Sequence, residues 1–273
     1  MNIVILAAGM GKRMHSRLPK VLQPVAGRPM LDHVLDATQG FSDSPRVVVV
    51  GHCAEEVRAR YCERSHLVFA LQPQLGTGHA LQIACSQLNF ADPHTFVCLG
   101  DVPLLSKKTI AAMREECGMN DLVLLTVKLD NPRGYGRIVR DEFGLVTAIV
   151  EEKDATAEQK LIREVNTGIM VLPTAKLKNW LSALTNSNAQ GEYYLTDVIG
   201  IAAREGARIA TVHPEHVYEV EGVNSKRQLA ALERTWQRAQ AEALLDEGVT
   251  LIDPARIDIR GELICAQDVE IDV

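Results

Sequence analysis

The chain lacks the features of several protein classes. Its 273 residues include six cysteines, no two of which form a C-x-x-C pair, so neither a zinc knuckle nor a redox dithiol is indicated. No apolar run approaches the roughly 18 residues that a membrane helix requires. The short run Ile3–Ala8 has no basic segment before it, unlike a signal peptide. We therefore expect a cytoplasmic protein with reduced thiols.

Positive charge is also scarce. The formal net charge is −6, and a protein that binds a nucleic-acid backbone needs a basic face. Hydrophobic residues make up 47% and charged residues 23%, which is an ordinary globular balance. The composition predicts no nucleic-acid partner and no membrane partner, while a few local cations are still enough to bind a phosphorylated small molecule.

Short β-branched runs alternate with helical patterns in the first half of the chain. This order predicts crossover units and a Rossmann-like, mixed but mostly parallel α/β sheet. The expected strands are 2–8, 46–51, 66–71, 95–101 and 121–129. Further along, we expect a hairpin over 136–152, a strand over 165–172 and helices over 175–184 and 194–204.

The end of the chain has two further patterns. A long helical segment covers 225–247 and ends at Gly248. After it, Leu251, Ile257, Leu263 and Val269 are spaced six apart, which is the period of a left-handed parallel β-helix; a coincidental strand pair is the alternative. We expect a nucleotidyltransferase domain over 1–224, a linker helix over 225–248 and the truncated start of a β-helix over 249–273.

A loop rich in small residues follows the first strand. Residues 6–14 read LAAGMGKRM, and their backbone N–H groups can approach a phosphate closely. Arg13 and Lys20 add cations at the carboxyl end of a parallel strand, where open α/β sheets bind ligands. The dinucleotide fingerprint fails because Met14 replaces its third glycine, and the spacing excludes a Walker A loop. The pattern favours a triphosphate-binding loop.

The segment 6–22 closely resembles the signature of sugar nucleotidyltransferases. Specifically, it resembles the N-terminal uridyltransferase domain of the bifunctional N-acetylglucosamine-1-phosphate uridyltransferase/glucosamine-1-phosphate acetyltransferase (GlmU) family. The resemblance continues in order over essentially the whole chain, and it implies a nucleotide-diphospho-sugar transferase (GT-A-like) fold. Its motifs are QLGTGHA (74–80), GDVPLL (100–105), NPRGYGRI (131–138), VEEKDAT (150–156), VNTGIMV (165–171), NAQGEYYLTDVI (188–199) and VEGVN (220–224).

The resemblance implies a reaction and its partners. UTP and N-acetylglucosamine 1-phosphate would give UDP-N-acetylglucosamine and pyrophosphate with Mg²⁺, for peptidoglycan, lipopolysaccharide and lipid A precursors that determine cell shape. Family members of full length are also acetyltransferases and homotrimers; we expect that activity to be missing and trimerisation to be weakened here. A nucleotidyltransferase for another base or sugar phosphate is the main alternative. A glycosyltransferase or a catalytically inactive sensor fits these motifs less well.

The implied site includes residues that would hold the metal ion and the phosphates. The resemblance assigns Mg²⁺ to Asp101 and Asn224 and catalysis to Arg13 and Lys20. A carboxylate after a strand suits a hard cation, although Asp101 could also be a helix cap and Asn224 could be the N-cap of the long helix.

The remaining residues are expected to hold the nucleotide and the sugar. For the nucleotide, Gln can both accept from and donate to uracil, but whether Gln72 or Gln74 does so stays open. Relatives often carry Tyr where this chain has Leu99. The full substrate-binding set is Leu6, Ala7, Ala8, Gly9, Lys20, Gln72, Gln74, Gly76, Thr77, Leu99 and Asn224 for the nucleotide side, and Gly136, Glu151, Asn166 and Thr167 for the sugar.

Overall fold

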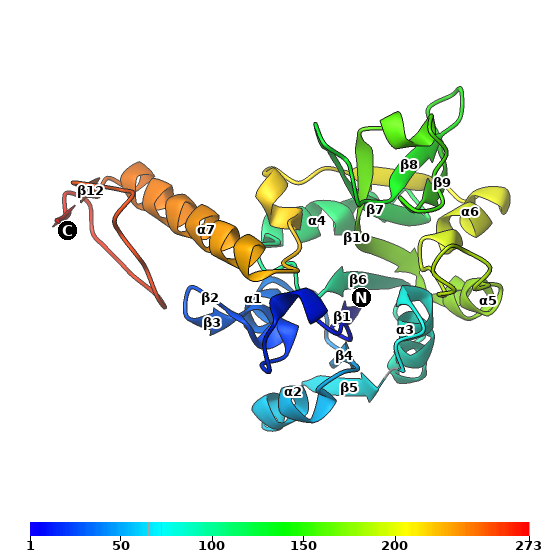
Figure 1. Cartoon of the computed structure of the whole chain (residues 1–273), viewed down its shortest axis with the longest axis horizontal. Coiled ribbons are helices and arrows are strands. Elements are labelled where there is room, and N and C mark those ends of the chain that lie inside the picture. Colours follow the sequence, from blue (N-terminus) through cyan, green and yellow to red (C-terminus); the bar gives the residue numbers. More distant parts are fainter. Residues whose placement is uncertain (65, 72, 273) are drawn as a thin grey trace.

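A computed structural model describes residues 1–64, 66–71 and 73–272. A nine-stranded sheet crosses these residues, with its main strands in the order β11-β7-β10-β6-β1-β4-β5 (Figure 1). The strands are β1 (Asn2–Leu6), β4 (Arg46–Val50), β5 (Leu67–Leu71), β6 (His94–Leu99), β7 (Leu122–Lys128), β8 (Arg137–Arg140), β9 (Val146–Val150), β10 (Glu164–Pro173) and β11 (Ile209–Val212).

The first half of the chain forms the parallel part of the sheet. β1 lies between β4 and β6 and is parallel to both, and β4 is parallel to β5. Val47–Val50 are buried on both faces of the sheet, as expected for a continuous β-branched run between two helical layers. The predicted crossover units are therefore confirmed.

The second half makes the sheet mixed. β10 inserts antiparallel between β6 and β7, while β11 is parallel to β7 at the edge. The predicted hairpin is β8 and β9, and β8 also pairs with β10. The prediction of a mixed, mostly parallel sheet is confirmed, and Figure 1 shows the hairpin beside β10, with which β8 pairs.

Helices cover both faces of this sheet. Ser106 caps α4 by accepting a hydrogen bond from the N–H of Thr109, as its position before the helix predicts. No helix within the described ranges is long and apolar enough to cross a bilayer. The helices are α1 (Met30–Ala37), α2 (Ala54–Tyr61), α3 (Thr77–Ala84), α4 (Lys107–Glu116), α5 (Leu177–Ser182), α6 (Asp197–Arg204) and α7 (Lys226–Asp246).

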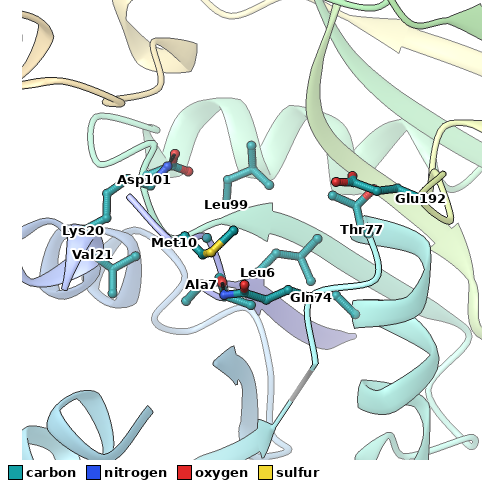
Figure 2. Close-up of a pocket in the computed structure, with 14 residues that line it drawn as sticks. Leu6, Ala7, Met10, Lys20, Val21, Gln74, Thr77, Leu99, Asp101 and Glu192 are labelled. Carbon is teal, nitrogen blue, oxygen red and sulfur yellow. Dashed lines mark hydrogen bonds and ion pairs between the residues drawn. The ribbon is translucent and has the colours of Figure 1, made fainter. Parts of the chain in front are cut away.

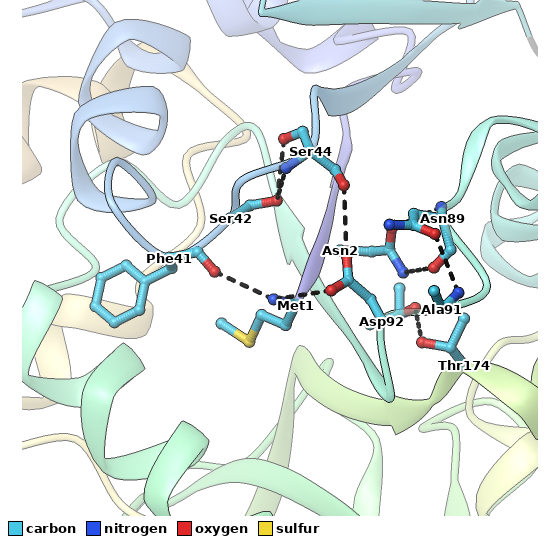
Figure 3. Close-up of polar contacts among 10 residues, drawn as sticks. Met1, Asn2, Phe41, Ser42, Ser44, Asn89, Ala91, Asp92 and Thr174 are labelled. Carbon is cyan, nitrogen blue, oxygen red and sulfur yellow. Dashed lines mark hydrogen bonds and ion pairs between the residues drawn. The ribbon is translucent and has the colours of Figure 1, made fainter.

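Polar contacts hold the edge of the sheet where β1 begins (Figure 3). The buried Asn2 side chain donates to the carbonyl of Asn89 at 2.9 Å and accepts from its N–H at 2.9 Å. The N-terminal ammonium lies 3.8 Å from the carboxylate of Asp92. These bonds satisfy polar groups at the edge remote from the phosphate loop and leave the carboxyl edge for ligands.

One prediction about the long helix is wrong. Asn224 is not its N-cap: the Ser225 hydroxyl accepts a hydrogen bond from the N–H of Gln228 instead. A serine satisfies that N–H as well as an asparagine does, and the Asn224 amide is left for another contact. The helix otherwise matches the prediction and ends before Gly248, whose φ of 89° suits only glycine well.

The C-terminal segment packs on the far end of α7 (Figure 1). Its strands β12 (Thr250–Leu251) and β13 (Glu270–Ile271) pair in parallel. Of the four residues with sixfold spacing, Leu251 is buried, whereas Leu263 and Val269 are 42% and 36% exposed. The start of a β-helix therefore stays a prediction.

The buried amide of Gln237 joins this segment to α7. Its Nε2 donates to the carbonyl of Ile259 at 2.9 Å, and its Oε1 accepts from the N–H of Ile259 at 2.7 Å. Nε2 also donates to Glu233 Oε1, and Glu233 Oε2 accepts from the N–H of Ala26. α7 is thus hydrogen-bonded to the turn between β2 (Pro24–Val25) and β3 (Arg28–Pro29) as well as to the C-terminal segment.

We expect Gln237→Leu to loosen residues 249–272 because it leaves two backbone groups of Ile259 without partners, at a local cost of about 2 kcal/mol or more. Hydrogen exchange should become faster in that segment and stay unchanged in β1 and β6. Gln240→Leu is the matched control, since the described residues give the Gln240 side chain no hydrogen-bond partner. Equal exchange in the two variants would contradict the assigned role of Gln237.

Candidate functional site

A cavity of about 340 Å³ opens at the carboxyl ends of β1 and β6. Figure 2 shows Lys20 and Asp101 toward one end of it, and Thr77 and Glu192 toward the other. Ligands of open α/β sheets bind at this edge. Most of the predicted nucleotide side lines the cavity, namely Leu6, Ala7, Ala8, Gly9, Lys20, Gln74, Gly76, Thr77 and Leu99, together with the predicted metal ligand Asp101.

The phosphate loop turns sharply after β1. Gly11 has φ 59°, and a Cβ there would lie 3.0 Å from Cβ of Lys20, so only glycine lets the two arms of the loop meet. A short 3₁₀ turn over Lys12–Met14 follows, and Met14 is buried beneath the loop. The exposed main chain of Gly9 and Met10 at the cavity suits an anionic ligand.

Lys20 joins the two predicted metal ligands. Its ammonium donates to the Asp101 carboxylate and, at 3.0 Å, to Oδ1 of Asn224. The Lys20 and Asp101 side chains are only 11% and 15% exposed. The N–H of Val223 bonds to the carbonyl of Asp101 at 3.0 Å, which holds the segment before α7 against the end of β6.

The donor set at this point fits a magnesium ion. A carboxylate and an amide oxygen from separate segments converge on one cation, and both are hard oxygen ligands. No group of three or more His, Cys, Asp or Glu ligands occurs within the described part of the chain. Mg²⁺ usually takes only one or two protein ligands and completes its shell with water and phosphate, so two donors are sufficient.

Arg13 is not brought into the cavity. It lies exposed on the 3₁₀ turn, and no described residue accepts a hydrogen bond or forms an ion pair with it. Its guanidinium is available to a ligand that extends beyond the loop. The predicted catalytic pair is therefore divided in space, with Lys20 at the metal ligands and Arg13 at the rim.

The loop before α3 forms the end of the cavity at which the nucleotide base is expected, and we call this end the base side. Nε2 of Gln74 donates to the carbonyl of Ala8 at 2.7 Å, which leaves Oε1 as the acceptor that a uracil N3–H needs. Gln72, the other candidate, lies outside the described residues. The Thr77 hydroxyl accepts from the N–H of Leu195 at 3.0 Å and still has its proton to donate.

Leu99 packs against the irregular part of β10. Its Cδ1 would lie 3.0 Å from a Cβ at Gly168, whose φ of 81° accompanies an irregularity in β10. The leucine thus fills space between β6 and β10 and presents an apolar surface to the cavity.

The predicted sugar residues cluster around β8 and β10 instead of lining the cavity. The N–H of Asn166 donates to the carbonyl of Gly136 at 2.9 Å, and a Cβ on Gly136 would lie 3.4 Å from both carboxylate oxygens of Glu151. Thr196 donates to Glu151 at 2.9 Å. Burial raises the pKa of Glu151, and the neighbouring Asp197 and Asp154 raise it further, while the Thr196 hydrogen bond lowers it.

The Thr167 hydroxyl is already engaged in the sheet. It donates to the carbonyl of Leu125 at 2.7 Å and accepts from the N–H of Ile169 at 3.2 Å. A sugar contact by this hydroxyl would have to replace one of these bonds, so its role stays a prediction.

Sequence reasoning missed Glu192 as a cavity residue. It lies in the QGEYYLTD motif, where a turn brings it beside the base side. The link is the neighbouring Tyr193, whose N–H bonds to the carbonyl of Leu75 at 2.9 Å and whose carbonyl accepts from the N–H of Gly78 at 2.8 Å. The motif was a signal, but only the fold shows that residues more than a hundred positions apart meet there.

Comparison with known proteins identifies the family to which this chain is similar. Residues 3–250 match the MobA-like NTP transferase domain. The whole chain is 57% identical to the bifunctional protein GlmU of Azoarcus sp. (strain BH72) and 54% identical to that of Herminiimonas arsenicoxydans. The chain spans about 60% of the length of these curated relatives. The predicted resemblance to the GlmU family is confirmed.

Solved structures support the fold. A putative glucose-1-phosphate thymidylyltransferase from Bacillus anthracis, in complex with a sucrose, has a TM-score of 0.66 at 17% identity and covers 85% of this chain and 95% of its own. HddC from Yersinia pseudotuberculosis, complexed with GMP-PN, has a TM-score of 0.61 at 17% identity and covers 86% and 99%. The structure from Bacillus anthracis supports the predicted GT-A-like fold.

We expect Gly76→Ala to damage the base side of the site. Gly76 has φ 114° and ψ 171°, a region nearly restricted to glycine, and a Cβ would lie 2.5 Å from the carbonyl oxygen of Tyr193. Denaturant unfolding should show a loss above about 3 kcal/mol. Gly134→Ala is the control: its φ is 89° but no atom lies within 4 Å, so about 1–2 kcal/mol is expected. Equal losses would contradict the clash.

We expect Glu151→Gln to stabilise the protein at pH 7 and to lose that advantage as the pH falls toward 4. The folded state raises the pKa of Glu151, so its ionised form is destabilising above that raised pKa, and the effect vanishes below the ordinary pKa of glutamate. Urea unfolding at several pH values measures this change.

Glu152→Gln is the matched control with the opposite sign. Arg137 Nη2 donates to Glu152 at 2.6 Å, and this bond and the Gly134 N–H hold the pKa of Glu152 below its usual range. Glu152→Gln should therefore be less stable than the wild type at pH 7 and equally stable at low pH. Parallel pH profiles for the two variants would show that the assignment is wrong.

Proposed function

The chain belongs to the family of MobA-like NTP transferase domains, and from this premise we propose that it transfers a uridylyl group from UTP to N-acetylglucosamine 1-phosphate. The products would be UDP-N-acetylglucosamine and pyrophosphate, made in the cytoplasm for cell-wall precursors. The observation that carries the proposal is one cavity in which the phosphate loop, Lys20, Asp101 and Gln74 converge. The likeness to GlmU proteins supports the choice of uracil and N-acetylglucosamine in this proposal.

The chemistry needs no covalent enzyme intermediate. An oxygen of the sugar phosphate attacks the α-phosphorus of UTP, a new P–O bond forms in line with the breaking one, and pyrophosphate departs with the bonding pair. The attacking oxygen is already ionised at neutral pH, so positioning and charge neutralisation supply the rate. Mg²⁺ held by Asp101 and Asn224 would lower the repulsion between the phosphates.

The chain's own residues have separate tasks in this scheme. Gln74 would accept from the base with Oε1, its amide group being fixed by the Ala8 carbonyl. Lys20 would neutralise the α-phosphate or the sugar phosphate. Glu151 and Asn166 would accept sugar hydroxyls, and Gly136 would offer its N–H to the acetamido group. The exposed Arg13 would neutralise the departing pyrophosphate.

The direct test mixes the protein with UTP, N-acetylglucosamine 1-phosphate and Mg²⁺ and measures pyrophosphate and UDP-N-acetylglucosamine. Removal of divalent ions by EDTA should stop turnover, and added Mg²⁺ should restore it. A panel with dTTP and glucose 1-phosphate decides the alternative base and sugar. No pyrophosphate with any pair would refute the proposal and favour a glycosyltransferase or a sensor.

We also propose that residues 249–272 belong to the start of a left-handed β-helix. The sixfold spacing and the parallel β12–β13 pair support this proposal.

We expect Arg13→Ala to lower kcat about 100-fold while changing the KM for the sugar phosphate little, because the lost charge acts on the leaving group. Lys12→Ala is the control on the same exposed turn and should have a much smaller effect. Steady-state pyrophosphate release measures both variants. An unchanged kcat in Arg13→Ala would remove Arg13 from the chemistry.

A further inference from the structure

Lys20 lies where the proposed metal would lie. We propose that Lys20 is an exchangeable cation, which neutralises Asp101 and donates a hydrogen bond to Asn224 in the nucleotide-free protein, and which moves to the phosphates when a divalent ion enters. The inference rests on the proposed metal role of these two residues, and it assigns Lys20 control over when the metal binds.

The contacts of the Lys20 ammonium support the exchange. It bonds to the Asp101 carboxylate and to Oδ1 of Asn224, so both oxygens are already directed at one positive charge. The backbone bond from Val223 to Asp101 holds the two segments side by side independently of Lys20. The oxygen pair is thus preorganised for a cation, and either an ammonium or a metal ion satisfies it.

The two cations exclude one another for electrostatic reasons. A lysine ammonium and a divalent ion within reach of the same two oxygens repel each other, and the repulsion is much stronger in a partly buried site than in bulk water. With side chains only 11% and 15% exposed, water screens Lys20 and Asp101 poorly. A metal ion on the oxygens therefore drives the ammonium away, and without another anion to receive it the exchange is unfavourable.

The cavity offers that second position. Lys20 lines it, and a Cβ at Gly9 would lie 3.7 Å from both Cε and Nζ of Lys20, so the ammonium is already beside the phosphate loop. A rotation within the flexible four-carbon stem is enough to turn the ammonium toward a bound phosphate. Metal and nucleotide then bind cooperatively, because each removes the obstacle to the other.

The test measures metal binding without nucleotide. Mn²⁺ titration followed by electron paramagnetic resonance should show weak binding to the wild type and about tenfold tighter binding to Lys20→Met, a fold-change within the usual range for coupled ligands. Mn²⁺ should also raise the Tm of Lys20→Met more than that of the wild type. Asp101→Asn in either background should abolish both effects.

Lys226→Met is the matched control. Lys226 lies two residues after Asn224, but its ammonium bonds to Gln23 and not to Asp101, so its loss removes a nearby charge without opening the oxygen pair. Affinity for Mn²⁺ should change less than about twofold in moderate salt. Equal affinities in the wild type and Lys20→Met, or the same gain in Lys226→Met, would overturn the exchange. Neither result affects wild-type turnover with UTP, which tests the proposed function separately.

Discussion

The contact of one ammonium with a carboxylate and an amide oxygen marks the point at which three segments of the chain converge to form the site. Lys20, Asp101 and Asn224 come from three segments, and the sequence separations of the two hydrogen bonds are 81 and 204 residues. Each segment arrives at this point for a different reason: a glycine-dependent turn, the end of a buried parallel strand, and the capped start of a helix. A defect in any of the three segments removes one partner from this contact.

Rigidity is distributed unevenly around this contact. The base side is fixed by backbone bonds to Tyr193 and by the amide of Gln74, while Arg13 is exposed at the rim. In the proposed reaction, a fixed base side and an exposed cation at the rim would suit one product that keeps the base and another that departs. The partly buried Glu151 has a raised pKa, so its charge is unfavourable in the folded protein, and in the proposed site a hydroxyl of the sugar would relieve this cost.

Most of the sheet could be predicted from sequence because buried parallel strands require long apolar runs, and the run at 47–50 is one of these. The phosphate loop was predictable for a similar local reason, since small residues and cations occupy consecutive positions. Features that depend on tertiary packing could not be predicted in this way. Nothing local distinguishes Asn224 from Ser225 as a cap, directs the Thr167 hydroxyl into the sheet, or brings Glu192 to the cavity; tertiary packing decides all three.

The separation of 204 residues between Lys20 and Asn224 has a consequence for biosynthesis. During translation the phosphate loop leaves the ribosome long before residue 224 is made, so the growing chain carries an unfinished site through most of its synthesis. Parallel strands β1, β4 and β6 can pair early, but Asn224 joins only when α7 begins to emerge. Under the proposed metal role, nascent chains released before that stage would contain much of the sheet and yet lack one of the two ligands of the divalent ion.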